Sequence, residues 1–279
     1  MTPRPISHII EPQYALEGAG VLLRRSIAPR ASNEYDPFLL FDHFAFNDPV
    51  EGPIRGFPMH PHRGIETVTY MLEGSVNHRD SLGNSGIIGA GDVQWMTSGR
   101  GILHEEMPRR SEESGVIYGF QLWVNLPAAQ KMSQPRYQEI SAATIPSVTI
   151  DGATVRVVAG EFNGTRGPVA EIAASPLYLD VMLDPASRFV CPVPRGHTAL
   201  AYVFEGSGKF SGAEVKSVRM VVFGDGDQIE VESETGVQFM LIAGMPFREP
   251  IVPYGPFVMN TVEEIQQTLA ELRNGTFIK

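Results

Sequence analysis

Four side chains that could bind a metal ion occur as two short pairs in this sequence. His60 and His62 are separated by a single residue, and so are His104 and Glu106. Side chains two residues apart on a β-strand point to the same face of the sheet, so two such pairs on neighbouring strands could aim four ligands at one point. Three imidazoles and a carboxylate suit a divalent first-row metal such as iron, manganese, nickel, copper or zinc. The spacing therefore predicts a mononuclear metal centre.

The same ligand set indicates an open site rather than a closed structural one. Structural zinc sites usually rely on cysteines, and this chain has a single cysteine, Cys191, which we expect to be a buried free thiol. An octahedral ion held by four protein ligands keeps two positions for water, dioxygen or a substrate oxygen. A divalent ion beside one carboxylate leaves a local charge of about +1, which attracts an anionic oxygen ligand.

The elements that must position these ligands are predicted to be short β-strands. The chain has 28 glycines and 22 prolines in 279 residues, as expected where tight turns join many strands. Residues 65–72 alternate in polarity and end at Glu73-Gly74, and residues 116–124 form the longest strand-like run of the first half. The turn-rich stretch 47–53 predicts a loop before His60. The predicted fold class is all-β, with strands closing into barrels or a sandwich.

The second half of the chain resembles a degenerate copy of the first, which predicts two tandem barrels. The copy contains one histidine, His197, and no histidine pair, so we expect the metal only in the first barrel. We assign residues 1–130 to the N-terminal metal-binding barrel, the polar stretch 131–146 to a linker, and 147–279 to a C-terminal barrel without a metal site. The matching segments are 73–75 with 205–207, 91–92 with 224–225 or 226–227, and 120–127 with 239–246.

One α-helix is predicted, at about 261–273, near the end of the chain. Thr261 and Glu264 have the spacing of a capping box. Apolar residues then follow at helical spacing, and Asn274-Gly275 marks the end. The spaced apolar residues are Val262, Ile265, Leu269 and Leu272, and we expect this amphipathic helix to pack on the flank of a barrel.

Charge and hydropathy exclude several classes of protein. The net charge is −10, with 22 basic against 32 acidic residues and no basic cluster, which argues against direct nucleic-acid binding. The first residues lack the apolar core of a signal peptide, and no apolar run is long enough to span a membrane. We therefore expect a cytoplasmic protein.

The long motifs around the candidate ligands resemble those of the pirin family of the cupin superfamily. They are residues 60–74 and 91–108, and the tail 248–261 is similar to the pirin C-terminal signature. The resemblance covers nearly the whole chain. It implies two jelly-roll cupin barrels with one metal ion, usually iron, in the N-terminal barrel, and it implies the ligands His60, His62, His104 and Glu106. Ordinary cupins take their carboxylate ligand from the first motif, where Glu66 stands here, whereas pirins take it from the second. Glu66 is therefore a candidate for contact with the ligands.

Apolar and polar residues close to the ligands in sequence could line a substrate pocket, as an aromatic substrate would require. For each apolar one the alternative is a place in the barrel core, and His43 could equally be structural. The pocket candidates are Phe41, His43, Phe57, Glu66, Met96 and Leu103.

The resemblance implies two main functions. The first is a quercetin 2,3-dioxygenase activity, in which dioxygen cleaves a flavonol that binds the metal through its 3-hydroxyl, with Glu106 as the catalytic proton acceptor. The alternative is a non-enzymatic adaptor that binds a transcription factor or metabolic enzyme according to the redox state of its iron. A structural bicupin with an idle site is the third and weakest hypothesis.

Overall fold

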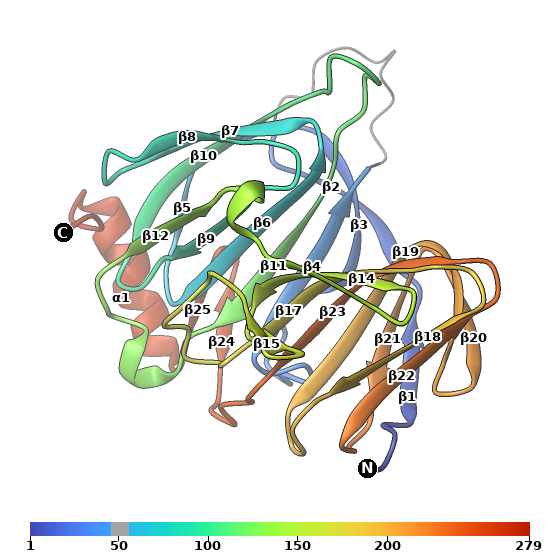
Figure 1. Ribbon diagram of the computed structural model, residues 1–279. Coiled ribbons are helices and arrows are strands. Elements are labelled where there is room, and N and C mark those ends of the chain that lie inside the picture. The colour runs from blue at the N-terminus through green and yellow to red at the C-terminus, as the bar shows by residue number, and fades with distance from the viewer. Residues whose placement is uncertain (46–55) are drawn as a thin grey trace. The chain divides into compact units, whose positions relative to one another are not determined.

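The computed structural model describes residues 1–45 and 56–279, and in this part the regular structure is mainly β-strand, with one α-helix, α1 (Val262–Arg273) (Figure 1). The predicted all-β class with a C-terminal helix is confirmed. The loop expected at 47–53 lies outside the described residues. Within them, no helix is both long and apolar enough to cross a membrane.

The chain divides into two compact units that are not consecutive stretches of sequence. The histidine unit comprises Gln13–Ala142 and Phe247–Lys279, and the second unit comprises Met1–Pro12 and Ala143–Pro246. The boundaries drawn from the sequence, 1–130, 131–146 and 147–279, stay a prediction, and this grouping differs from them at both ends of the chain. The reason lies in strand pairing, because each end contributes elements to the unit that holds the other half.

The histidine unit has a seven-stranded sheet in the order β12-β9-β6-β11-β4-β3-β2 and a four-stranded sheet in the order β5-β10-β7-β8. Apolar residues of both sheets pack together in one cluster. The strands are β2 (Gln13–Glu17), β3 (Val21–Ile27), β4 (Phe38–Phe44), β5 (Phe57–His62), β6 (Ile65–Glu73), β7 (Ser75–Asp80), β8 (Ser85–Ile88), β9 (Val93–Thr97), β10 (Ile102–Arg109), β11 (Tyr118–Asn125), β12 (Arg136–Ile140), β24 (Val252–Tyr254) and β25 (Phe257–Met259).

The second unit has a seven-strand path in the order β1-β21-β19-β23-β17-β14-β13, and further strands pair beside it. Its strands are β1 (Ile6–Ile10), β13 (Ser147–Ile150), β14 (Ala153–Ala159), β15 (Glu161–Phe162), β16 (Thr165–Arg166), β17 (Leu177–Leu183), β18 (Ser187–Pro192), β19 (Thr198–Phe210), β20 (Ala213–Lys216), β21 (Arg219–Phe223), β22 (Gln228–Ser233) and β23 (Val237–Gly244). Two short 3₁₀ turns, Ala128–Gln130 and Ala142–Thr144, complete the elements.

The internal repeat expected from the sequence is confirmed by the order of the strands. β6, β11 and β4 occupy in one path the positions that β19, β23 and β17 occupy in the other. The repeated Glu-Gly turns also match, because Gly74 and Gly206 have φ of 74° and 70°. An added Cβ would lie 2.6 Å from the Arg109 carbonyl oxygen at Gly74 and 2.3 Å from that of Gly236 at Gly206. Both turns therefore require glycine.

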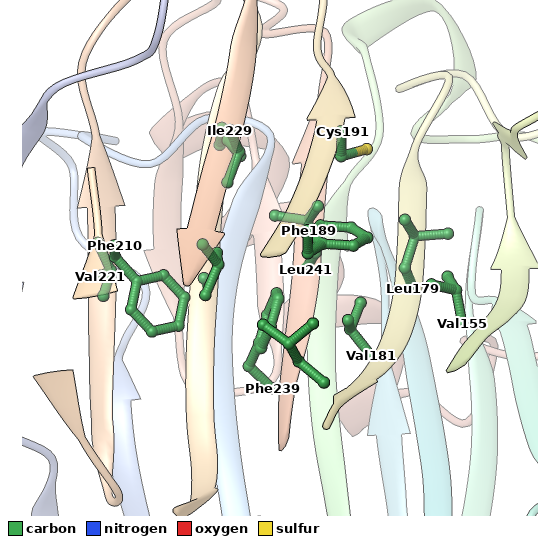
Figure 2. Close-up of a cluster of buried hydrophobic side chains, with 14 of the residues drawn as sticks. Val155, Leu179, Val181, Phe189, Cys191, Phe210, Val221, Ile229, Phe239 and Leu241 are labelled. Carbon is green, nitrogen blue, oxygen red and sulfur yellow. The ribbon is translucent and has the colours of Figure 1, made fainter. Parts of the chain in front are cut away.

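Aliphatic and aromatic side chains pack together in the core of the second unit (Figure 2). The Phe239 ring meets Phe189 and Phe210 edge-on, with ring centroids 5.6 and 5.2 Å apart. Cys191 lies in the same cluster as the buried free thiol that we expected, and burial raises its pKa to about 12. Such a thiol is protonated and unreactive at neutral pH.

The C-terminal helix begins and ends as predicted. The Thr261 side chain accepts a bond from the Glu264 amide at 3.2 Å, and the Glu264 carboxylate accepts one from the Thr261 amide at 3.0 Å. Ile265 packs with Phe257 of β25 in one buried cluster, and Figure 1 shows α1 beside β24 and β25 at the red end of the chain. The helix belongs to the histidine unit.

Phe239→Ala should lower the free energy of unfolding by about 3–5 kcal/mol, because the side chain is fully buried and leaves a cavity between two other rings. Urea unfolding of the purified protein measures this. Met182→Ala, on the adjacent strand β17 and 42% exposed, is the matched control and should change stability by no more than about 0.5 kcal/mol. Equal losses in both variants would contradict the core position of Phe239.

Candidate metal centre

The two histidine pairs lie on β5 and β10, which are antiparallel neighbours in the four-stranded sheet. His60 is directly opposite His104 in the register, and the register shifts between His104 and Glu106. His62, two residues after His60, points to the same side of β5. The strand pairing therefore brings together the three imidazoles that the sequence singled out.

The three rings converge closely. Their candidate ligand atoms all lie within 4.8 Å of one another. The Nε2 atoms of His60 and His62 are 3.1 Å apart, and the His104 ring centroid lies 4.3 Å from that of His60 and 5.0 Å from that of His62. His62 and His104 are buried, and His60 is partly exposed. The cluster is thus reachable from one side.

Hydrogen bonds decide which nitrogens face the centre. His62 Nδ1 is 3.2 Å from the Pro256 carbonyl oxygen, and His60 Nδ1 is 2.9 Å from that of Pro58. A carbonyl oxygen only accepts, so both Nδ1 atoms carry the proton and both Nε2 atoms present lone pairs. Two lone pairs facing each other at 3.1 Å repel each other, and a cation between them would relieve the repulsion.

Burial keeps the imidazoles of His62 and His104 neutral. It lowers the pKa of His62 to about 3, with a further contribution from His60, and it lowers the pKa of His104 well below its usual value. In the part of the chain that the structure describes, neither ring nitrogen of His104 has a hydrogen-bond partner. Converging imidazole nitrogens with free lone pairs are the donor set that a divalent transition metal requires. The residues present therefore fit a metal ion.

Glu106, the fourth predicted ligand, is buried on β10 but is held differently. Its two carboxylate oxygens accept bonds from the Thr69 hydroxyl at 2.8 Å and from Gln121 Nε2 at 3.1 Å. It is not part of the group of three whose ligand atoms lie within 4.8 Å. Its role as a ligand stays a prediction.

Glu66 lies on β6, and its carboxylate accepts hydrogen bonds from two side chains of β9. Trp95 Nε1 donates to it at 3.1 Å and the Thr97 hydroxyl at 2.8 Å. Burial raises its pKa to about 7 despite these two donors. Its hydrogen bonds therefore fix Glu66 within the seven-stranded sheet.

A cavity of about 360 Å³ opens beside His60 and His62. Of the pocket candidates from the sequence, Phe57 lines it. Phe41, Glu66 and Met96 are fully buried side chains of the seven-stranded sheet, and Leu103 is partly exposed on β10. The other lining residues are Glu17, Gly18, Arg25, Pro29, Leu40, Asp42, Pro58, Gln121, Trp123, Gly255 and Pro256.

His43 is buried among aromatic rings rather than at the cavity. Its ring centroid lies 4.9 Å from those of both Tyr118 and Phe120. Burial lowers its pKa to about 3, and the charge of Arg24 adds to the shift. These surroundings favour the structural role of His43, which was the alternative to a place in the pocket.

Several cavity residues were missed from the sequence. Arg25 forms two hydrogen bonds with Asp42, at 2.8 and 2.7 Å, and a third with Glu17 at 2.6 Å. Burial raises the pKa of Asp42 to about 6, and the bonds from Arg25 oppose that shift. These residues come from β2, β3 and β4 and carry no motif, so only their strand pairing could have revealed them.

Comparisons with known proteins bear on the whole chain. A family model described as Pirin matches residues 20–124, and one described as Pirin C-terminal cupin domain matches residues 178–278. A "Pirin-like protein" of Caulobacter vibrioides is 43% identical over 99% of this chain and 100% of its own length. "Pirin" of Homo sapiens is 44% identical over 92% of this chain and 88% of its own. The crystal structure of quercetin 2,3-dioxygenase from Acinetobacter baumannii has a TM-score of 0.89 at 34% identity, covering 99% of this chain and 98% of that one.

Glu66→Gln should show how the buried carboxyl affects stability. The folded pKa of Glu66 is raised to about 7 from 4.5, so between these pH values the unfolded chain gives up a proton that the folded chain keeps. Wild-type stability relative to the variant should therefore fall from pH 4.5 to 7 and stay constant above pH 7. Urea unfolding at several pH values measures the difference. A difference that rises over this range would show that the folded state favours the ionised carboxylate.

Proposed function

Because the chain belongs to the pirin family and contains its two cupin domains, we propose that it is a mononuclear iron enzyme with quercetin 2,3-dioxygenase activity. One observation carries the proposal, namely the convergence of three imidazoles on a point beside an open cavity. The likeness to the Acinetobacter baumannii quercetin 2,3-dioxygenase, at 34% identity over nearly the whole chain, supports the reaction class.

The proposed metal is held by His60, His62 and His104, and Glu106 joins as the fourth ligand. We propose iron because a mixed set of imidazoles and one carboxylate, with open positions, is typical of non-haem iron. Manganese, nickel, copper and zinc are the alternatives for the same donors. The bound ion would act as a Lewis acid and as a template for the substrate oxygen.

The cavity beside the histidines suits a flat aromatic substrate with several hydroxyls. Its volume of about 360 Å³ is within the usual range of small-molecule sites. Trp123 and Phe57 supply apolar surface, and the Trp123 ring stands edge-on to His62 at 5.1 Å between centroids. Glu17, Arg25 and Gln121 place polar groups on the same wall. A flavonol presents both kinds of surface.

Glu106 is the proposed acceptor for the proton of the flavonol 3-hydroxyl. Gln121 lines the cavity and also donates to Glu106, so the carboxylate lies next to the substrate space. The bonds from Thr69 and Gln121 fix its orientation. Once the flavonol is deprotonated, flavonol and dioxygen together supply every atom of the ring-opened ester and carbon monoxide, so the reaction needs no external reductant.

His62→Ala should abolish metal loading and turnover together, because it removes a central imidazole. The expected loss of metal affinity exceeds the roughly 10- to 100-fold that follows loss of an outer partner of a ligand. Bound metal is measured by mass spectrometry of the purified protein, and turnover by oxygen uptake with quercetin. The control is His8→Ala, an exposed histidine on β1, which should leave both unchanged. Full iron loading without any turnover in the wild type would contradict the enzyme and favour the iron-dependent adaptor.

Glu106→Gln should separate proton transfer from metal binding. The amide keeps the size of the side chain and can still contact Thr69 and Gln121, but it cannot take up a proton. We expect kcat to fall by about 10²–10⁴, with iron still bound through the three histidines. The measurements are kcat for quercetin and iron per chain. A variant with wild-type turnover would exclude Glu106 as the proton acceptor.

A further inference from the structure

The C-terminal segment of the chain contacts the candidate metal centre directly. The Pro256 carbonyl oxygen lies 3.2 Å from His62 Nδ1, and the two residues are 194 positions apart in sequence. Gly255 and Pro256 also line the cavity beside His60 and His62. This carbonyl determines which nitrogen of His62 carries the proton, and hence whether Nε2 can bind a metal.

Arg63, the residue next to His62, ties the same strand to the C-terminal helix. Its guanidinium is buried and donates to the Arg100 carbonyl at 2.6 Å, the Thr268 hydroxyl at 2.9 Å and the Glu271 carboxylate at 2.6 Å. It also lies 4.5 Å from the centre of the Phe277 ring. Thr268 and Glu271 are one turn apart on α1, so Arg63 holds one face of the helix.

The backbone of Phe257 and Val258 packs against the residue that follows β5. Arg63 and Phe257 form an isolated parallel β-bridge, and the Val258 amide donates to the Arg63 carbonyl at 3.2 Å. A Cβ on Gly64, whose φ is 80°, would lie 2.2 Å from the Val258 carbonyl oxygen, so this approach is possible only for glycine.

Lys131 binds both the segment after the histidine pair and the C-terminal segment. Its buried ammonium donates to the carbonyls of Gly64 at 2.9 Å and Val258 at 2.7 Å, and to the Asn125 side chain at 2.7 Å. All three donors of the ammonium are thereby used. Gly64 follows the histidine motif and Val258 follows Pro256 by two residues, so the bonds fix the two segments to each other.

We propose that residues 247–279 are a positioning element of the metal centre. In this proposal Arg63 and Lys131 anchor the segment, and the anchored Pro256 carbonyl holds His62 as the Nδ1–H tautomer with Nε2 free for the metal. Arg63, Thr268 and Glu271 are positioning residues that act through Pro256, since none of them is a ligand. The inference rests on the metal centre of the proposed function, but it does not depend on the reaction catalysed there.

The double variant Thr268→Val with Glu271→Leu removes two of the three acceptors of Arg63 and leaves the ligands unchanged. Titration of the metal-free protein with cobalt(II), followed by its visible absorption, should show about 10- to 100-fold weaker binding than the wild type. Lys279→Met is the matched control, because Lys279 bonds the other oxygen of Glu271 at 3.0 Å and does not contact Arg63; its affinity should be unchanged. Wild-type affinity in the double variant would overturn the proposal.

A second measurement covers the case in which the double variant does not fold. Nitrogen-15 NMR of the metal-free wild type reports the tautomer of each histidine. We expect His62 to carry its proton on Nδ1, and a proton on Nε2 instead would overturn the proposal. Neither measurement requires turnover. A wild type that binds cobalt but does not consume oxygen with quercetin would contradict the dioxygenase function and leave the positioning role intact.

Discussion

The central constraint in this protein is the forced proximity of the lone pairs of His60 and His62. Their Nε2 atoms are 3.1 Å apart, and burial makes protonation of His62 unfavourable. The repulsion cannot be relieved by turning the rings, because each Nδ1 is bonded to a backbone carbonyl. A cation bound between the two nitrogens would relieve it. The surrounding fold can thus be understood as a device that keeps these donors in place in the absence of the ion.

The second unit shows what the same strand order becomes without this constraint. Its seven-strand path repeats that of the histidine unit, but its interior is a hydrophobic core that includes Phe189, Phe210 and Phe239. The turn glycines Gly74 and Gly206 are required in both, since their φ and close contacts are alike. Backbone geometry is therefore shared between the copies, whereas the side chains differ, one copy having a ligand cluster and the other a packed core.

How much could be predicted from the sequence follows from the range of each interaction. Period-two spacing was enough to bring His60 and His62 to one face, and a four-residue capping box was enough to place the start of α1. Glu106 was harder, because the register shift that precedes it is not visible in the spacing. The substrate pocket stays a prediction, and Phe41 and Met96, which are near the ligands in sequence, are buried in a sheet. Several residues that line the cavity come from strands distant in sequence.

Each end of the chain belongs to the compact unit that the opposite half of the chain forms. This arrangement explains why residues distant in sequence surround the histidines. β12 pairs with β9 in the histidine unit as β1 pairs with β21 in the second unit, so the strand at each edge comes from outside its repeat. The final 33 residues likewise belong to the histidine unit. A fragment that ended in the predicted linker at 131–146 would retain all three histidines but lack the Pro256 carbonyl, the helix that Arg63 holds and one acceptor of Lys131. The ligands are thus encoded early in the chain, whereas the groups that orient His62 are encoded at its end.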